Sequence, residues 1–443
     1  MDDQENNKTM ETPVPSAGFS DSFLAFLKDN HIDPRVYNVF DRLPRYVRIL
    51  RTKQYSTEEI EVLVKQMSDD AGCEVRPVAG VPGFLEIADS TVKLSQLQAY
   101  KSGAIVGMDV SSGIAALALS VSPGDNVLDL CCAPGAKLLF LAEMLHNGRC
   151  NTGGCNNIAR GSVTGVDISA HRAATCRSLV KRHAVNDKAF IRLFLDDGTT
   201  FDRKAPNAFW WNPKKIQSTP EARNKSNDMT WRKQRQAEGR PWFAGKQLGS
   251  AYACCGTELY DRVLVDAECT HDGSLAHVYK YERWGWEQLD SRVINDNRSA
   301  SVPLLQTRLL ENGWRLLKPG GILVYSTCSL SRYQNEYVLG GFLSRHPEDE
   351  ARVEMVPLLA SSTIAVSPIW KPESDAEWAS HGLEMQRHLF DRMGHSFRLD
   401  PTVSNTSGMF VARIRKLKHG FDFSDHADQL VPLGSAKTEH SNK

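Results

Sequence analysis

The chain has 443 residues, of which 41% are hydrophobic, and this length allows two or three domains with a large core. Lysine plus arginine balances aspartate plus glutamate at 53 each, so any basic surface for nucleic acid must be local. There is no run of about 18 apolar residues, and the acidic first residues lack an apolar stretch, which argues against a transmembrane helix, a secretory signal and a transit peptide.

Ten cysteines are too few in a chain of this length for a disulfide scaffold. The vicinal pairs at 131–132 and 254–255 are poorly placed to form ordinary bridges within each pair. Cys150 and Cys155 lie in a loop without a nearby histidine or second cysteine pair, which disfavours a zinc site there. We therefore expect free thiols, no metal ion, and a reducing compartment, either the cytoplasm or the nucleus.

The first part of the chain predicts a tail and a small module. Residues 1–19 are polar with scattered prolines and are expected to be disordered. Phe23 then begins a helical apolar face, residues 45–50 alternate as a strand does, and residues 57–67 place apolar side chains at helical spacing. These elements predict a small α/β module over residues 20–100.

From residue 101 onward, apolar strands alternate with helices. The expected strands are 127–130, 162–167, 191–195, 262–266 and 321–325, and the first expected helices are 138–145 and 170–183. This alternation predicts a doubly wound α/β fold with a parallel sheet, whose ligands bind at the carboxyl ends of the strands. We expect this domain to cover residues 101–418, with a flexible tail over residues 419–443.

Residues 201–260 interrupt the alternation. They hold four tryptophans, at positions 210, 211, 231 and 242, and residues 201–250 carry eleven Lys+Arg against four Asp+Glu, a net charge of +7. Aromatic residues interleaved with cations suit single-stranded or loop RNA, because bases stack on the rings and phosphates meet the cations. A solvated, disordered insertion is the alternative interpretation of this stretch.

The loop Cys131-Cys-Ala-Pro-Gly-Ala-Lys137, between the first strand and its helix, is a candidate cofactor site. Gly135 lets the backbone approach a ligand, and the amino terminus of the next helix favours negative groups. Asp167 ends the next strand, where a ribose needs a bidentate acceptor, and Asp196-Asp197 follows the third strand, placed for an adenine amino group. No Walker pattern occurs, which disfavours ATP. Capping of the following helices is the alternative role for both acids.

Two cysteines follow the ends of two later strands, in Asp266-Ala-Glu-Cys269 and Ser326-Thr-Cys328. A single intracellular cysteine is usually a small buried hydrophobic residue, but these two are expected to open onto one crevice. A pair of thiols suits methylation of a pyrimidine carbon. One thiolate adds to carbon 6 and makes carbon 5 nucleophilic, and a base then removes the carbon 5 proton so that the thiolate can leave.

These segments resemble the Sun family of RNA cytosine-C5 methyltransferases over residues 44–415. The matching stretches are residues 127–137, 263–269, 317–330 and 407–412, and the most specific is Tyr325-Ser-Thr-Cys-Ser-Leu330 after Lys318-Pro-Gly-Gly. The resemblance implies a Rossmann-like class I methyltransferase fold with a small α/β N-terminal RNA-binding module. It also implies S-adenosyl-L-methionine as cofactor and RNA, either tRNA or rRNA, as partner. We expect a monomer that does not bind membranes.

The resemblance assigns roles to individual residues. It implies that Cys328 is the nucleophile and that Cys269 assists its release. Asp266 and Lys137 are implied to lie near the target base. The cofactor contacts that it implies are Cys131, Ala133, Pro134, Gly135, Ala136, Lys137, Asp167, Arg172, Asp197 and Asp266.

Two positions depart from the family pattern. Glu268 stands where the family usually has proline, and its charge is expected to raise the pKa of Cys269. Ala136 replaces the second glycine of the cofactor loop, which is a mild change. Glu268 puts the release step in doubt, so the main alternative is a member that binds RNA without turnover. A methyltransferase of proteins or small molecules is a second alternative, but the Asn/Asp-Pro-Pro-Tyr pattern typical of that class does not occur.

Overall fold

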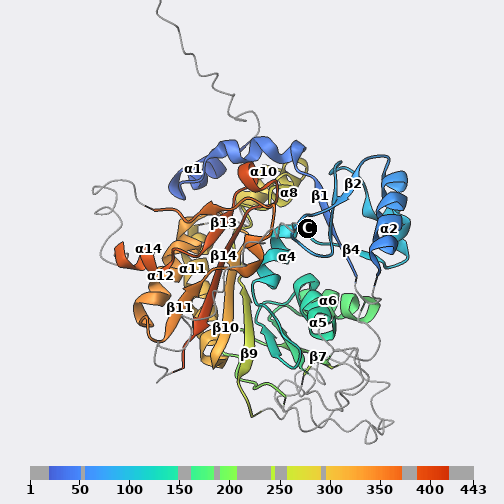
Figure 1. Cartoon of the computed structure of the whole chain (residues 1–443). Coiled ribbons are helices and arrows are strands. Elements are labelled where there is room, and N and C mark those ends of the chain that lie inside the picture. Colours follow the sequence, from blue (N-terminus) through green and yellow to red (C-terminus); the bar gives the residue numbers. More distant parts are fainter. Residues whose placement is uncertain are drawn as a thin grey trace, which may run out of the picture.

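The computed structural model describes residues 19–50, 55–147, 161–183, 190–206, 241–244, 257–290, 296–371 and 387–418. A ten-stranded sheet forms its centre (Figure 1). Across the sheet the strands are β12 (Ser367–Pro368), β13 (Phe397–Leu399), β14 (Met409–Lys416), β10 (Leu317–Thr327), β9 (Tyr260–Asp266), β5 (Asn126–Asp129), β6 (Ser162–Asp167), β7 (Phe190–Leu195) and β8 (Phe243–Ala244), and β11 (Ala351–Glu354) pairs with β14.

The five central strands, from β10 to β7, are parallel. The chain passes from β5 outward through β6 and β7 and then returns to β9 on the other side of β5. The strand order therefore reverses between β5 and β9, which is where open α/β sheets bind ligands beyond their carboxyl ends. β14 runs antiparallel to β10. The prediction of a doubly wound, mostly parallel sheet is confirmed.

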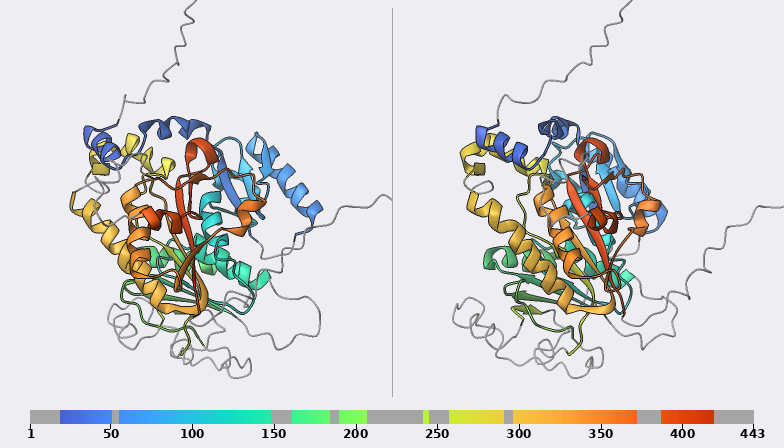
Figure 2. Two further views of the ribbon diagram at one scale, coloured as in Figure 1. Left: turned by 60° about the vertical axis from the view of Figure 1, so that its left-hand side comes forward. Right: turned by 90° about the vertical axis from the view of Figure 1, so that its left-hand side faces the viewer.

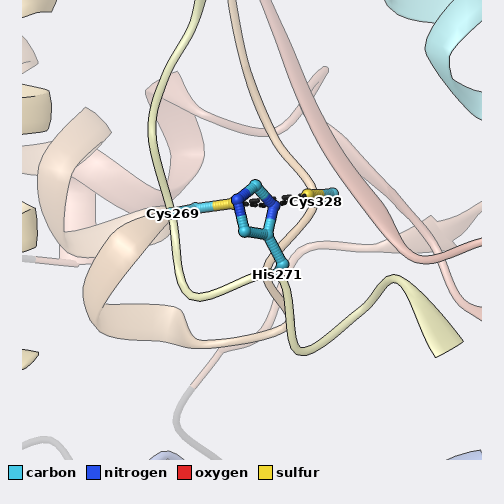
Figure 3. Close-up of side chains that lie close together, drawn as sticks. All are labelled: Cys269, His271 and Cys328. Atoms are coloured by element: carbon cyan, nitrogen blue, oxygen red, sulfur yellow. Dashed lines mark hydrogen bonds between the residues drawn. The ribbon is translucent and has the colours of Figure 1, made fainter. Parts of the chain in front are cut away.

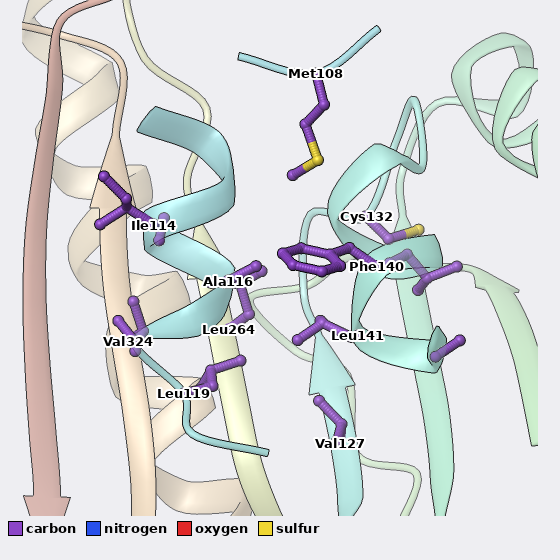
Figure 4. Packing of buried hydrophobic residues seen from close by; sticks show 14 of the residues in the cluster. Met108, Ile114, Ala116, Leu119, Val127, Cys132, Phe140, Leu141, Leu264 and Val324 are labelled. Atoms are coloured by element: carbon purple, nitrogen blue, oxygen red, sulfur yellow. The ribbon is translucent and has the colours of Figure 1, made fainter. Parts of the chain in front are cut away.

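Helices cover both faces of this sheet (Figure 2). One face carries α4 (Val110–Leu117), α5 (Ala136–Asn147) and α6 (Ala170–His183), and the other carries α11 (Asp296–Leu316), α12 (Glu336–Arg345) and α14 (Arg387–Arg392). Successive strand residues point to opposite faces, so Val324 of β10 packs with Ile114 of α4, whereas Leu323 packs with Leu310 of α11. Figure 4 shows the α4 and α5 side of this core.

A second sheet of four antiparallel strands lies beside the large one. Its order is β2 (Val75–Pro77), β3 (Phe84–Ile87), β1 (Arg45–Ile49) and β4 (Ile105–Gly107). α2 (Thr57–Ala71) covers it and begins with a capping box between Ser56 and Glu59. The helix ends at Gly72, whose φ of 67° is the left-handed conformation that favours glycine.

The remaining helices are short. They are α1 (Asp21–Asp29), η1 (Pro34–Arg42), η2 (Leu94–Gln96), α3 (Gln98–Lys101), α8 (Leu275–Val278), α9 (Lys280–Trp284), α10 (Trp286–Leu289), η7 (Arg332–Gln334), η8 (Pro357–Ala360) and α15 (Pro401–Ser404). None of the described helices combines the length and apolar character needed to cross a membrane.

The two halves of the predicted amino-terminal module have different neighbours. Phe23 of α1 and Tyr37 of η1 pack against the α8–α10 segment, with the ring of Trp286 6.0 Å from that of Phe23. The small sheet instead contacts α5, where Arg48 forms a buried ion pair with Glu143 at 2.5 Å. The boundary between residues 20–100 and 101–418 stays a prediction.

Several expectations lie outside the described residues. They concern Cys150, Cys155, Cys254, Cys255, Trp210, Trp211, Trp231, residues 1–18 and the tail 419–443. Of the predicted insertion, residues 201–206, 241–244 and 257–260 are described. Trp242 packs beneath the guanidinium of Arg177, 4.5 Å from the ring centre, so this tryptophan has a structural contact.

Candidate active site

A cavity of about 420 Å³ opens at the carboxyl ends of the parallel strands, where the strand order reverses. Nine of the predicted site residues line it: Cys131, Ala133, Pro134, Lys137, Asp167, Arg172, Asp197, Asp266 and Cys328. The structure thus brings together residues from five separate segments of the chain, as expected for strand ends of one parallel sheet. Gly135, Ala136 and Cys269 are the predicted residues that do not line the cavity.

The loop between β5 and α5 requires glycine at position 135. Gly135 has a φ of 109°, and a Cβ placed on it would lie 2.8 Å from the Sγ atom of Cys176. Any side chain here would therefore meet α6 and strain the backbone. Ala136 begins α5, so the second departure from the family pattern is accommodated as an ordinary helical residue.

Asp167 ties this loop to the end of β6. One carboxylate oxygen accepts a hydrogen bond from the backbone of Ala133 at 3.2 Å, and the other accepts from the backbone of Ser169 at 2.8 Å. Arg172 donates to the carbonyl of Ala133 at 2.7 Å. Asp167 therefore caps the following helix through Ser169 and holds the loop through Ala133, and it also lines the cavity.

Beyond β7, Asp197 accepts hydrogen bonds from the backbone and hydroxyl of Thr199, both at 2.8 Å, and also lines the cavity. Ile168, directly after Asp167, is 69% exposed although it is a large apolar residue at the cavity. Two carboxylates with an exposed apolar side chain between them suit a nucleoside, which offers hydroxyls, an amino group and a flat ring. Sequence reasoning did not single out Ile168.

Asp266 at the end of β9 is held by two partners. Lys137 Nζ lies 2.8 Å from one of its oxygens, and Ser326 donates its hydroxyl to the other at 2.8 Å. Lys137 also donates to Ser112 at 3.1 Å. Burial lowers the pKa of Lys137 and the Asp266 carboxylate raises it, with a net rise, so Lys137 stays cationic. The carboxylate and the ammonium thus form a fixed polar pair in the cavity wall.

The two predicted cysteines meet. The Sγ atoms of Cys269 and Cys328 are 3.3 Å apart, with Cys269 buried and Cys328 partly exposed at the cavity. His271 joins them, with its Nδ1 atom 2.9 Å from the sulfur of Cys328 and 3.6 Å from that of Cys269 (Figure 3). Sequence reasoning missed His271, because one histidine two residues after a cysteine carries no specific signal.

The three groups share protons. The hydrogen bond that Cys328 donates to Cys269 lowers the pKa of Cys269, and the facing His271 lowers it further. The same hydrogen bond raises the pKa of Cys328, and burial also raises it. The charge of Cys269 raises the pKa of His271 to about 9. These directions favour a negative charge on Cys269 over one on Cys328, with the positive charge of His271 beside both sulfurs.

The same three side chains are the usual donors to soft metals, and their donor atoms lie within 4.8 Å of one another. A tetrahedral zinc holds sulfur at about 2.3 Å and nitrogen at about 2.0–2.1 Å, which separates S from N by roughly 3.5 Å and S from S by roughly 3.8 Å. The distance from Nδ1 to the sulfur of Cys269, 3.6 Å, agrees with such a site, but the other two separations, 2.9 Å and 3.3 Å, are shorter. They are spacings of hydrogen-bonded partners.

Hydrogen bonds of Asp272 and Gly273 hold the loop that carries His271 in place. Asp272 is buried and accepts hydrogen bonds from the hydroxyls of Thr270 and Ser329 and from the backbone of Leu330 at 2.6 Å. Gly273 donates to the carbonyl of Cys328 at 3.0 Å. These contacts fix the Cys269 loop against the Cys328 loop.

Comparison with known proteins identifies relatives of this chain. Residues 246–415 match the family described as 16S rRNA methyltransferase RsmB/F. A 5-cytosine rRNA methyltransferase NSUN4 from Bos taurus is 31% identical over 237 residues, covering 53% of this chain and 43% of the relative. A tRNA (cytosine(49)-C(5))-methyltransferase from Pyrococcus abyssi is 24% identical over 368 residues, covering 83% of this chain and 86% of the relative. The chain thus spans less than half of the NSUN4 relative's length.

Solved structures share the fold. A methyltransferase homolog protein from Pyrococcus horikoshii superposes with a TM-score of 0.54 at 22% identity, covering 90% of this chain and all of that one. NSun6 from Pyrococcus horikoshii with SFG gives a TM-score of 0.54 at 16% identity, covering 90% of this chain and 99% of that one. The expected Rossmann-like class I methyltransferase fold is confirmed.

Proposed function

We propose, from the site and from the match of residues 246–415 to the family described as 16S rRNA methyltransferase RsmB/F, that this chain transfers a methyl group from S-adenosyl-L-methionine to carbon 5 of cytosine in RNA. The observation that carries the proposal is the pair of thiols, 3.3 Å apart beside Asp266. Oxygen or nitrogen methylation needs no thiol, whereas carbon 5 must first be activated by addition to carbon 6.

The cavity suits the proposed cofactor. Asp167 would take the ribose hydroxyls, Asp197 the adenine amino group, and Ile168 the face of the ring. The loop at Gly135, where a Cβ would collide with α6, would let the backbone approach the ligand closely. The cofactor supplies the methyl group as an activated sulfonium.

In the proposed reaction, Cys328 attacks carbon 6 because it is the member of the cysteine pair that is exposed at the cavity, whereas Cys269 is buried. Asp266 would hydrogen-bond the N3/N4 edge of the cytosine, with its orientation fixed by Lys137 and Ser326. Cys269 would take the carbon 5 proton so that Cys328 can leave. Cys269 is buried next to Cys328, with the two Sγ atoms 3.3 Å apart.

The test is methyl transfer from labelled S-adenosylmethionine to total RNA by the wild-type chain and by Cys328→Ala. We expect incorporation by the wild type and a loss of several orders of magnitude in the variant, with cofactor affinity nearly unchanged. Activity above about a tenth of wild type in Cys328→Ala would refute the nucleophile assignment. No incorporation by the wild type would favour the alternative, an RNA-binding relative without turnover.

The relatives act on both rRNA and tRNA by their names, and we leave both as candidate substrates. Bisulfite sequencing of RNA from a deletion strain would locate the cytosine that depends on this chain. We further propose that the protein acts as a monomer. We place it in the cytoplasm or nucleus, because the two thiols must stay reduced to react.

A further inference from the structure

We propose that His271, as an imidazolium between the two sulfurs, stabilises the thiolate of each cysteine in turn: Cys328 during attack and Cys269 during release. This inference rests on the proposed function and adds a further catalytic residue to it. It comes from the position of Nδ1, which is within hydrogen-bonding distance of Cys328 and also faces Cys269.

Cys328 needs a cation because its surroundings oppose a negative charge, and the buried Cys269 has the charge of His271 facing it. The hydrogen bond to Cys269, burial and the nearby Asp266 raise the pKa of Cys328. Lys137, the other cation facing Cys328, is already paired with Asp266 at 2.8 Å. Among the described groups that face this site, His271 is therefore the cation that can balance the charge of a thiolate.

The other titratable groups leave His271 charged. Asp266, Lys137, Asp272, His277 and Tyr325 face the three residues, and Glu268 lines the same cavity. Burial and the charge of His271 lower the pKa of His277 to about 4, so this second imidazole is neutral near pH 7. Burial raises the pKa of Asp272, whose oxygens are occupied by Thr270, Ser329 and Leu330.

Before the attack, Cys328 passes the proton of its hydrogen bond to Cys269, so that the negative charge lies on Cys328 and faces the imidazolium of His271. The sulfur's electron pair forms the bond to carbon 6, and the C5=C6 pair forms the bond from carbon 5 to the methyl group. The pair of the broken methyl–sulfur bond stays on the cofactor's sulfur. Cys328 is now uncharged, which leaves the imidazolium without its partner.

In the release, the imidazolium stabilises the other sulfur. Cys269 loses its proton to water, which is the one proton that methylation liberates, and its thiolate takes the proton from carbon 5. The C5=C6 bond re-forms, and the pair of the S–C6 bond returns to Cys328 as a thiolate facing His271. The Sγ–Sγ distance of 3.3 Å lets one cation serve both sulfurs without a change of position.

The backbone offers a suitable variant. His271 has a φ of 57°, and asparagine is the non-glycine residue that best tolerates this left-handed conformation. His271→Asn thus keeps the loop and removes the cation. His388→Asn is the control, because His388 is an exposed residue on α14 that does not line the cavity.

The decisive measurement is alkylation by iodoacetamide across pH 6–10, read at each site by peptide mass spectrometry. Cys328 is followed in Cys269→Ala and Cys269 in Cys328→Ala, each with and without His271→Asn. We expect His271→Asn to slow both thiols at least tenfold at pH 7, a shift of about one pKa unit, with the deficit closing as pH rises above the thiol's ordinary pKa of about 8.5.

Alkylation needs no RNA, so it tests His271 even if the proposed methylation fails. Rates within twofold of the parent variants would overturn the proposal, and so would an effect on one thiol alone or an equal loss at every pH. In the methylation assay, His271→Asn should lower kcat about 100-fold or more near pH 7 while the cofactor's Kd stays unchanged. His388→Asn should match the wild type in both assays.

Discussion

At the scale of single residues, the release step has two candidate bases, because Glu268 lines the cavity beside Cys269. If Cys269 takes the carbon 5 proton, Cys269→Ala should stall after methyl transfer and leave protein covalently attached to RNA. The adduct would run as a slower band on a denaturing gel. The double variant with Cys328→Ala should lose this band, since no thiol remains to attack carbon 6.

Glu268→Pro is the companion variant, because it restores the family's usual residue and removes the carboxylate. Normal turnover by Cys269→Ala together with a trapped adduct in Glu268→Pro would transfer the release role to Glu268. Full activity without an adduct in either variant would leave Cys269 as a packing residue.

The residues at strand ends could be predicted from the sequence, because apolar strands in an α/β pattern place their next polar residues along one edge. Asp167, Asp197, Asp266 and Cys328 all reach the cavity for this reason. His271 could not be predicted, since its position depends on the turn after Cys269 and on contacts with the Cys328 loop. Ser112 reaches Lys137 only through the packing of α4 against α5.

At the scale of elements, the amino-terminal helices support the catalytic loop. The hydroxyl of Tyr37 in η1 is buried and donates to the carbonyl of Asp272 at 2.9 Å. Tyr37→Phe removes the donor and leaves a buried carbonyl without it, which costs about 1–3 kcal/mol. We expect this loss in the free energy of unfolding together with a lower kcat, since Asp272 is next to His271.

Tyr279→Phe is the matched control. Its hydroxyl also donates to a backbone carbonyl at 2.9 Å, but that carbonyl belongs to Tyr37 and not to the catalytic loop. It should lower stability without a comparable fall in kcat. Equal effects on kcat in the two variants would contradict a specific role for the Tyr37 contact. Urea unfolding and methyl-transfer kinetics on the same preparations measure both quantities.

The central strands were predictable because buried parallel strands are short apolar runs, as in residues 262–266 and 321–325. The edge strands were not, since β12 has two residues and β13 three, too few to show a periodicity. The partners of α1 were also hidden, because its apolar face is equally suited to the small sheet and to the α8–α10 segment. The contact that α1 makes in the structure is with residues some 250 positions away in the sequence, and no local pattern indicates that contact.

At the scale of the whole molecule, one buried ion pair joins the small sheet to the large domain. Arg48 of β1 and Glu143 of α5 have side chains 0% and 1% exposed, and the guanidinium also lies 4.4 Å from the ring centre of Phe140. A pair of this kind adds little net stability, because both charges lose their water. Removal of only one partner lowers the free energy of unfolding strongly, because the charge of the other partner stays buried.

We therefore expect Glu143→Ala to lower the free energy of unfolding by about 3–5 kcal/mol, since Arg48 would keep an uncompensated charge. The double variant Arg48→Met/Glu143→Leu should recover most of this loss, because apolar groups of similar volume need no partner. Arg76→Ala breaks the exposed pair with Glu86 on the same sheet and should cost less than about 1 kcal/mol. Urea midpoints of the three variants measure these values, and a double variant as unstable as Glu143→Ala would show that the contact acts through packing and not through charge.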